Sequence, residues 1–383
     1  MDDRRLITTP PIASSRGTLL GQHSLPSMVL LLSFFGIATL ADAVQDPRND
    51  HLYTRVAPDD TRVAPEGGAP DGPASGGADK DSQALDPGRA RYDAGDYGGA
   101  ERFFRQRWTG ADDQVCAFEL GRTLMATGRW RAAVSVLEEA LPAAEDDAAY
   151  HRLLGEALGR SARSASIFRQ LGIARRGLHQ FERAVALDPG NLEARDSLME
   201  YYLQAPGIAG GGEAKALEQA RETAAFNAAE GQRMLGRINH EKGREAAART
   251  AYARAVQIDP GNLLARVGQA RLAIDLEDWD LAFTALDAAL ARAPENSMAR
   301  FELGRAAASS GLRLDDGAKA LEAYVARPRP ATEKPASEAW TLRASIAELA
   351  HDPQAARRAY RAALAADPGN KAAKRALTRL GED

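Results

Sequence analysis

The residues that first suggest chemistry are four glycines within a six-residue window, Gly207, Gly210, Gly211 and Gly212, in the stretch YYLQAPGIAGGGEAKA. A glycine-rich turn that opens a helix often holds phosphate, because the first backbone N–H groups of the helix point at the anion. Here Glu213 stands where the P-loop motif needs lysine, and no serine or threonine follows to hold magnesium. The apolar run before the turn is helical in pattern, whereas that motif follows a strand. We therefore interpret the stretch as an elbow between two helices, not as a nucleotide site.

Other reactive residue types are sparse. The single cysteine, Cys116, excludes an internal disulfide and a zinc site built from cysteines, and the six histidines form no HExxH motif. Ser161, Ser164, Ser166 and His179 lie in one segment, but they form no nucleophile–base–acid pattern. We predict a protein that is not an enzyme and that needs no cofactor, metal or small-molecule substrate. An enzyme with its site in this segment remains a minor alternative.

The composition permits a large folded core. The chain has 383 residues, of which 44% are hydrophobic and 27% charged, and its formal net charge is -4. A dedicated nucleic-acid binder usually carries a basic face, which this mildly acidic balance does not favour. We therefore expect no nucleic-acid partner.

The first 43 residues have the pattern of an export signal. Three arginines precede the apolar run MVLLLSFFGIATL at 28–40, and Ala41-Asp42-Ala43 offers small residues for cleavage after Ala43. As a helix this run rises only about 20 Å, which is short of the roughly 30 Å hydrocarbon core. We expect a cleaved signal peptide over 1–43 and a periplasmic or otherwise exported protein. An uncleaved segment anchored in the inner membrane is the alternative.

Residues 44–82 form a predicted disordered linker. They are rich in Pro, Gly, Asp and Ala, and they include the small duplication TRVAPDD–TRVAPEG. So few apolar residues cannot offset the entropy cost of ordering the chain.

Beyond the linker the sequence repeats itself. Leu-Gly pairs are followed by a second glycine seven residues later, and Asp-Pro-Gly-Asn recurs from Asp188, Asp259 and Asp367. Pro260 and Pro294 are 34 residues apart. These motifs resemble the tetratricopeptide repeat, a 34-residue helix–turn–helix unit. The long third unit, followed by LDPGN and APGIAGGG, is similar to a subgroup of exported bacterial proteins of that family.

The resemblance implies an all-α solenoid, a right-handed superhelix of about eight helix pairs over 83–370, closed by a capping helix at 371–383. Small residues at the eighth and twentieth places of a unit let its helices A and B approach closely; three such pairs are Gly121 with Ala133, Gly236 with Ala248, and Ala270 with Ala282. The proline of Asp-Pro-Gly-Asn ends helix B, and the asparagine caps the next helix A. No unit buries its apolar stripe alone, so neighbouring units must stack.

Three insertions lie between helices A and B of their units, at 159–177, at 205–212 and near 312–317. They are expected to project from one edge of the solenoid, and the first two, in adjacent units, are expected to touch. Insertions concentrated on one edge often mark a binding surface. A tolerated loop expansion is the alternative, since surface insertions cost little.

In this family, places 2, 5, 9, 12 and 13 of helix A line the concave face. Place 9 is arginine in four units, and one more arginine stands at place 5; the five residues are Arg122, Arg237, Arg271, Arg305 and Arg233. Arginine forks match carboxylates, so an acidic or C-terminal peptide would suit this row. Alternatively, the arginines neutralise their own helices, because Arg237 has Glu241, and Arg271 has Asp275, at i+4.

Apolar residues occupy other groove places and would serve either as footholds for a partner or as core: Phe118, Phe301, Met125, Val267, Ile274 and Met298. The groove lacks the asparagine and lysine of the family's carboxylate clamp, so heat-shock chaperone tails are not expected as partners. The resulting hypothesis is an exported, non-catalytic scaffold that binds protein or peptide partners through its concave groove. An adaptor that works through the edge formed by 159–177 and 205–212 is the alternative. The sequence names neither the partner, the pathway nor the oligomeric state.

Overall fold

The computed structural model describes residues 84–381, and all the regular structure in this range is helical. The predicted signal peptide and linker lie outside the described residues. Consecutive helices form pairs, and the first helix of each pair is called helix A. In chain order the helices A are α3 (Asp86–Asp93), α5 (Gln114–Ala126), α7 (Ala148–Arg163), α9 (Leu192–Gln204), α11 (Ala228–Glu241), α13 (Leu263–Asp275), α15 (Ser297–Ser310) and α17 (Ala336–Leu349). The second helix of each pair is called helix B, and the helices B are α4 (Tyr97–Arg107), α6 (Trp130–Ala140), α8 (Ile167–Leu187), α10 (Glu213–Phe226), α12 (Glu245–Ile258), α14 (Trp279–Arg292), α16 (Leu314–Ala326) and α18 (Pro353–Ala366).

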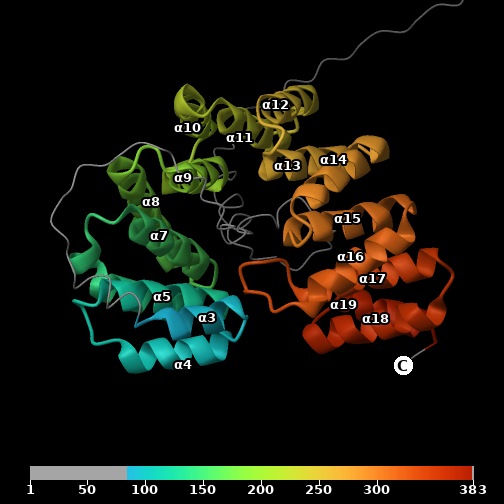
Figure 1. Cartoon of the computed structure of the whole chain (residues 1–383), viewed down its shortest axis with the longest axis horizontal. Coiled ribbons are helices and arrows are strands. Elements are labelled where there is room, and N and C mark those ends of the chain that lie inside the picture. The colour runs from blue at the N-terminus through green and yellow to red at the C-terminus, as the bar shows by residue number, and fades with distance from the viewer. Residues whose placement is uncertain (1–83, 382–383) are drawn as a thin grey trace, which may run out of the picture.

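The eight described pairs stack side by side into a curved array, and α19 (Lys371–Arg379) packs on α18 at its end. Figure 1 shows the stack bending through an arc, so that α3–α4 and α17–α19 both lie at the bottom of the view. From α5 to α17, each helix A packs against its own helix B and against the next helix A. The predicted all-α solenoid of about eight repeats is confirmed. No helix within 84–381 combines the length and the hydropathy needed to cross a membrane.

Helix starts are fixed by capping side chains. Asn191, Asn262, Asn296 and Asn370 each accept a hydrogen bond from the backbone N–H three residues on, at 2.8–3.0 Å. Each bond satisfies a donor that the first turn leaves unpaired. The predicted capping role of these asparagines is therefore confirmed.

Small residues lie where the two helices of a pair cross. A Cβ added at Gly121 would stand 2.7 Å from the Leu137 side chain, and one at Gly236 would stand 2.7 Å from the ring of Tyr252. Ala133 is fully buried at the same kind of crossing. Larger residues there would force the helices apart, as the repeat pattern predicts.

The insertion at 159–177 differs from the expected loop. Residues 159–163 end α7 and residues 167–177 begin α8, so that only 164–166 lie outside a helix. The insertion thus lengthens both helices of the third pair. It contains no proline, and an added turn of paired helix satisfies its own backbone hydrogen bonds, which an exposed loop does not.

The glycine-rich stretch is an elbow between α9 and α10, as predicted. It forms a single 3-10 turn (Gly207–Ala209), and α10 begins at Glu213. The N–H groups of Gly210 and Gly211 donate to backbone carbonyls of the same segment, and that of Gly212 donates to the Tyr202 carbonyl at the end of α9. These donors are already engaged, so they do not form a cradle for phosphate.

The two adjacent insertions touch, as predicted. The Arg175 guanidinium donates to the backbone oxygen of Ile208 at 2.9 Å. The buried Tyr201 hydroxyl lies between the two segments, 3.0 Å from the Ala174 oxygen and 2.8 Å from the Ala209 oxygen. The insertion near 312–317 is small: Gly311 and Arg313 both have positive φ, and Arg313 pairs with Asp287 of α14.

One connection runs across the array. Residues 327–335, which we call the strap, join α16 to α17 and reach the first two helix pairs (Figure 1). The backbone N–H of Ala331 donates to the oxygen of Ala126, the last residue of α5, at 2.7 Å. The two ends of the arc are therefore in contact, and the described chain forms a closed ring.

Candidate functional site

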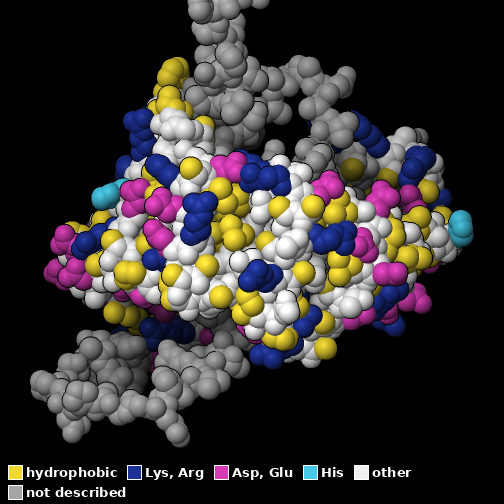
Figure 2. Space-filling view, turned by 90° about the horizontal axis from the view of Figure 1, so that it is seen from above, with side chains coloured by type: hydrophobic (Ala, Val, Ile, Leu, Met, Phe, Trp, Pro, Cys, Tyr) yellow, Lys and Arg dark blue, Asp and Glu magenta, His cyan; other side chains and the backbone are white. Residues whose placement is uncertain are grey.

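The concave side of the array encloses a central cavity of about 1070 Å³. Its walls come mainly from the helices A of the first seven pairs, α3 to α15, and from the strap, with additions from α4, α12 and the end of α14. Arginine, aspartate and glutamate side chains share these walls with Phe118, Met125, Val267 and Met298. The cavity therefore combines apolar patches with charges of both signs. The outer surface is also mixed, as Figure 2 shows on one face.

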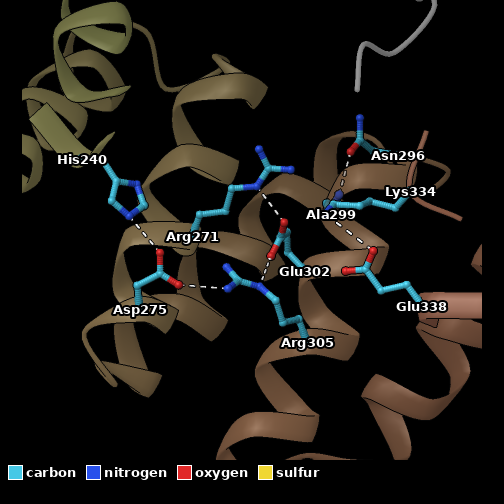
Figure 3. A network of polar contacts seen from close by, with 9 residues as sticks. All are labelled: His240, Arg271, Asp275, Asn296, Ala299, Glu302, Arg305, Lys334 and Glu338. Atoms are coloured by element: carbon cyan, nitrogen blue, oxygen red, sulfur yellow. Dashed lines mark hydrogen bonds and ion pairs between the residues drawn. The ribbon is translucent and has the colours of Figure 1, made fainter. Parts of the chain in front are cut away.

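The most connected part of the wall is a network across α11, α13 and α15 (Figure 3). Glu302 is fully buried, and its two oxygens accept hydrogen bonds from Arg271 at 2.7 Å and from Arg305 at 2.6 Å. Arg305 also donates to Asp275 at 2.9 Å, and Asp275 lies 2.9 Å from His240 Nε2. Burial alone would raise the pKa of Asp275, but the hydrogen bonds from His240 and Arg305 lower it.

The next two arginines join α11 to α9. Arg233 is buried between Asp196, at 2.5 Å, and Glu230, at 2.6 Å. Arg237 donates to Glu200 at 2.9 Å. Burial alone would lower the pKa of Arg233 and of Arg237, but the neighbouring carboxylates raise both above the ordinary arginine value. Both arginines therefore remain charged.

The structure corrects the pairing within one helix, at i+4, that was predicted for Arg237 and Arg271. Arg237 bonds to Glu200 of the preceding pair instead of Glu241, and Arg271 bonds to Glu302 of the following pair instead of Asp275. Sequence spacing shows only neighbours on the same helix. The stacking of helices A brings carboxylates of adjacent pairs within reach of the same arginines, which then link one repeat to the next.

Arg122 and Phe118 lie on α5 and both line the cavity. The Arg122 guanidinium stands 4.1 Å from the ring centre of Tyr92, a cation–π geometry, and forms an ion pair with Glu119 at 2.8 Å. Phe118 is half-buried, with its ring 6.1 Å from that of Tyr150. Both residues are accessible from the cavity, as a site there requires.

Phe301, which was predicted either to contact a partner or to belong to the core, belongs to the core. It is buried, with 3% of its surface exposed, and its ring packs 5.4 Å from that of Tyr324. Of the five predicted arginines, Arg122, Arg237 and Arg271 line the cavity. Arg233 also lies at the cavity wall but is buried, and Arg305 is not among the residues that line the cavity. Periodicity places a residue on the correct face but does not show how deeply the neighbouring helix covers it.

Tyr252 is a cavity residue that is absent from the predicted site. It lines the cavity between two glycines: a Cβ at Gly236 would lie 2.7 Å from its ring, and one at Gly268 2.5 Å. Burial raises the pKa of its hydroxyl to about 12, although Arg237 and Arg233 lower it. A second glycine at 268, opposite a large residue, was a signal for this close packing.

Arg271 is the guanidinium best placed to bind a partner. Its Nε is held by Glu302, and Figure 3 shows its two terminal nitrogens directed away from that carboxylate. Its side chain is 20% exposed and lines the cavity. The buried pair fixes the orientation of the guanidinium plane, so its outer edge is already positioned for a second acceptor.

The third-repeat insertion does not assemble a catalytic group among the described residues. The Ser164 hydroxyl donates to the Ser161 carbonyl at 3.1 Å. His151 Nδ1 lies 2.6 Å from Gln180 Oε1, so this end of α8 packs beside residue 151 of α7. His179 therefore stands about 15 Å along the helix from Ser161. Within 84–381 no group of three or more His, Cys, Asp or Glu side chains has the geometry to hold a metal.

Comparison with solved structures gives likenesses of the fold alone. A chain of the APC/C hetero-tetramer Cut9–Hcn1 is 15% identical with a TM-score of 0.44, over 74% of this chain; the match spans 58% of that chain. TTC0263, a thermophilic tetratricopeptide protein of Thermus thermophilus, is 22% identical with a TM-score of 0.41, over 51% of this chain and 97% of its own. YrrB, described as having an unusual peptide-binding site, is 15% identical with a TM-score of 0.34, over 64% of this chain and 99% of its own.

Family models give a direct assignment. No curated protein matches this chain. Two models, both described as tetratricopeptide repeat, match residues 91–157 and residues 214–262, 267–312 and 311–371, together more than half of the chain. With the helix pairs, their small crossing residues and their capped turns, these matches show that the chain belongs to the tetratricopeptide repeat family.

Proposed function

We propose that this protein is an exported, non-catalytic scaffold that binds an extended segment of a partner protein in the central cavity. Proteins of its family generally act as scaffolds that bind peptides or proteins. The observation that carries the proposal is the cavity itself: at about 1070 Å³ it is slightly larger than the roughly 300–1,000 Å³ typical of small-molecule pockets. Its charged and apolar walls suit a peptide chain better than one compact ligand.

The partner segment is proposed to carry an exposed carboxylate, from an acidic side chain or a chain terminus. Most cavity arginines already bind carboxylates of this chain, so the cavity does not attract negative charge in general. Arg271 also binds a carboxylate, that of Glu302, but only through its Nε, and the outer edge of its guanidinium faces the cavity. A guanidinium edge binds a carboxylate through two parallel hydrogen bonds, which a lysine cannot reproduce.

Substitution of Arg271 by lysine tests this assignment. Arg271→Lys keeps the charge next to Glu302 but loses the planar edge. We expect the affinity for a labelled acidic peptide with a free C-terminus to fall about tenfold, the size of one lost charge-assisted hydrogen bond. Arg254→Lys, on the exposed surface of α12, is the matched control and should bind as the unaltered protein does.

Fluorescence anisotropy with free-acid and amidated forms of the peptide gives the readout, and circular dichroism checks the fold. Equal affinities for Arg271→Lys and Arg254→Lys would rule out Arg271 as the carboxylate anchor. Binding of every peptide outside the cavity, shown by cross-linking, would rule out the cavity as the site.

Export is proposed from the signal pattern of 1–43. Mass spectrometry of the protein from envelope fractions should find Val44 as the first residue. A protein that retains residues 28–40 would instead be the membrane-anchored form.

A second candidate surface is the edge that carries the insertions. Each of the three insertions exposes a large apolar side chain, Phe168 at 94%, Ile208 at 52% and Leu312 at 50%. Exposed apolar groups beyond those needed for folding favour a contact with another protein. Affinity capture from envelope extracts with Phe168→Ser and Arg271→Lys compares the two surfaces, because the variant that loses the captured protein identifies the working surface.

A further inference from the structure

The strap, residues 327–335, is unlike the other connections from helix B to the next helix A. It is the longest of the described connections of this kind, whereas three of the others, at 188–191, 259–262 and 293–296, are four-residue turns that end in a capping asparagine. The strap is nine residues long, and it includes Pro328, Pro330 and Pro335. Proline fixes φ and removes a backbone donor, so a segment with three prolines has few conformations to lose and gives up little entropy on docking.

One side of the strap is firmly attached to the seventh and eighth pairs. The buried Tyr324 hydroxyl donates to the Lys334 backbone oxygen at 2.8 Å, and the Arg329 guanidinium lies over the Tyr324 ring at 5.2 Å. Glu333, itself nearly buried, accepts from the Ser297 hydroxyl at 3.3 Å and pairs with Arg327. These contacts hold the base of the strap in place.

The other side touches the first two pairs through few contacts. The Ala331 N–H donates to the Ala126 oxygen, and the Pro328 ring lies against Gly95, where an added Cβ would come within 1.9 Å of the Pro328 Cβ. At Gly128 an added Cβ would lie 3.4 Å from the Ala331 Cβ. A single neutral hydrogen bond and small apolar contacts contribute little net stability. This is therefore the more weakly held side of the strap.

The same segment forms part of the cavity wall. Arg327, Pro328, Pro330, Thr332 and Glu333 all line the central cavity. We propose that the strap is a latch, which closes the array into a ring around the cavity and releases the first two helix pairs to admit the partner segment. The admitting role rests on the proposed function, whereas the closing contact does not.

The closing contact is tested without any partner. Spin labels on cysteines placed at the exposed positions Arg102 of α4 and Arg358 of α18 report the distance across the closure. Gly95→Ala should lengthen and broaden this distance, because the new methyl group displaces Pro328. Gly243→Ala is the matched control: it has the same place after helix A and a similar φ, 66° against 76°, but its Cβ would meet nothing within 4 Å. Identical distance distributions for the two variants would overturn the latch.

The admitting role is tested by locking the ring. Gly128→Cys with Ala331→Cys places two Cβ atoms near the roughly 3.8 Å separation of a disulfide. The native Cys116 does not compete, because it is buried and burial raises the pKa of its thiol to about 12. Oxidation of the double variant should slow association of the free-acid peptide probe at least tenfold, and reduction should restore it.

The outcomes separate the two proposals. Equal association rates in the oxidised and reduced protein would overturn the admitting role and leave the proposed function standing. If neither form binds the peptide, the proposed function and the admitting role both fall, while the closing contact is decided by the spin-label distances.

Discussion

Glu302 shows what single residues contribute to the inner wall. It is fully buried, and both of its oxygens accept from arginines of two different helices, α13 and α15. A buried ion pair is costly to assemble, but removal of one partner is more costly because the other charge remains without compensation. The network therefore fixes the position of Arg271 more than it adds net stability.

We predict that Glu302→Gln lowers the free energy of unfolding by about 3–5 kcal/mol, since it leaves two adjacent guanidinium groups without their shared carboxylate. Glu295→Gln is the control, because Glu295 pairs with Arg300 while 85% of its side chain is exposed. Such an exposed pair contributes about 0–1 kcal/mol. Urea unfolding of both variants gives the comparison, and equal midpoints would contradict the role assigned to Glu302.

Asp275 makes the network sensitive to acid. Its pKa is lower in the folded protein than the unfolded value of about 3.9. The carboxylate therefore stabilises the fold fully above about pH 5, and this contribution is lost as the pH falls through the folded-state pKa. We predict that Asp275→Asn lowers the melting temperature at pH 7 and that the difference from the unaltered protein shrinks below about pH 4. Asp280→Asn, at an exposed position of α14, should show no such convergence.

At the scale of helices, glycine positions show how closely the pairs pack. Gly268 lies within α13 against the Tyr252 ring, whereas Gly172 lies within α8 with nothing within 4 Å of an added Cβ. A glycine-to-alanine substitution in α13 would therefore meet a closely packed ring, whereas one in α8 would meet open space. In open space alanine favours a helix, and at a close crossing its methyl group forces the neighbours apart.

Gly172→Ala should stabilise the protein by about 0.5–1 kcal/mol, the difference in helix propensity. Gly268→Ala should destabilise it by about 1–3 kcal/mol, the usual cost of overpacking. Thermal unfolding followed by circular dichroism measures both. Stabilisation by Gly268→Ala would mean that α12 and α13 are less closely packed than the structure shows.

At the scale of the whole molecule, an array of repeats needs a protected end. The last pair is covered by α19, whose Ala373, Ala376 and Leu377 are buried in one cluster with Tyr360 and Ala363 of α18. The other end of the array meets the strap instead. The ring closure and α19 thus protect the two ends of the stack by different means.

Truncation after Asn370 removes α19 and exposes the apolar surface of α18. We predict that the free energy of unfolding falls by at least about 1.5–3 kcal/mol, which is the contribution of burying Leu377 alone. We also predict that the truncated chain self-associates through the exposed surface. Lys374→Ala, at an exposed site of α19, is the control. Size-exclusion chromatography with light scattering checks the association, and a truncated chain that stays monomeric and equally stable would contradict the capping role.

The sequence by itself determined the repeat architecture, because its signals are local. Leucine–glycine pairs, Asp-Pro-Gly-Asn turns and capping asparagines act within one or two turns of helix, and α9, α13 and α19 each begin directly after the asparagine of such a turn. Those same signals identified α5, α11, α13 and α15 as the helices that carry the inner arginines. They also identified the glycine-rich stretch as an elbow, since it has the glycines of a phosphate-binding loop but lacks the lysine and the serine or threonine.

Only the tertiary structure decided which residues meet. Arg271 and Glu302 are 31 positions apart, and Ala126 and Ala331 are separated by most of the array. Such contacts depend on the rotation between successive pairs, which sums over seven steps and is not encoded in any one repeat. The depth of Phe301, the partners of the arginines and the closed ring all follow from that accumulated curvature.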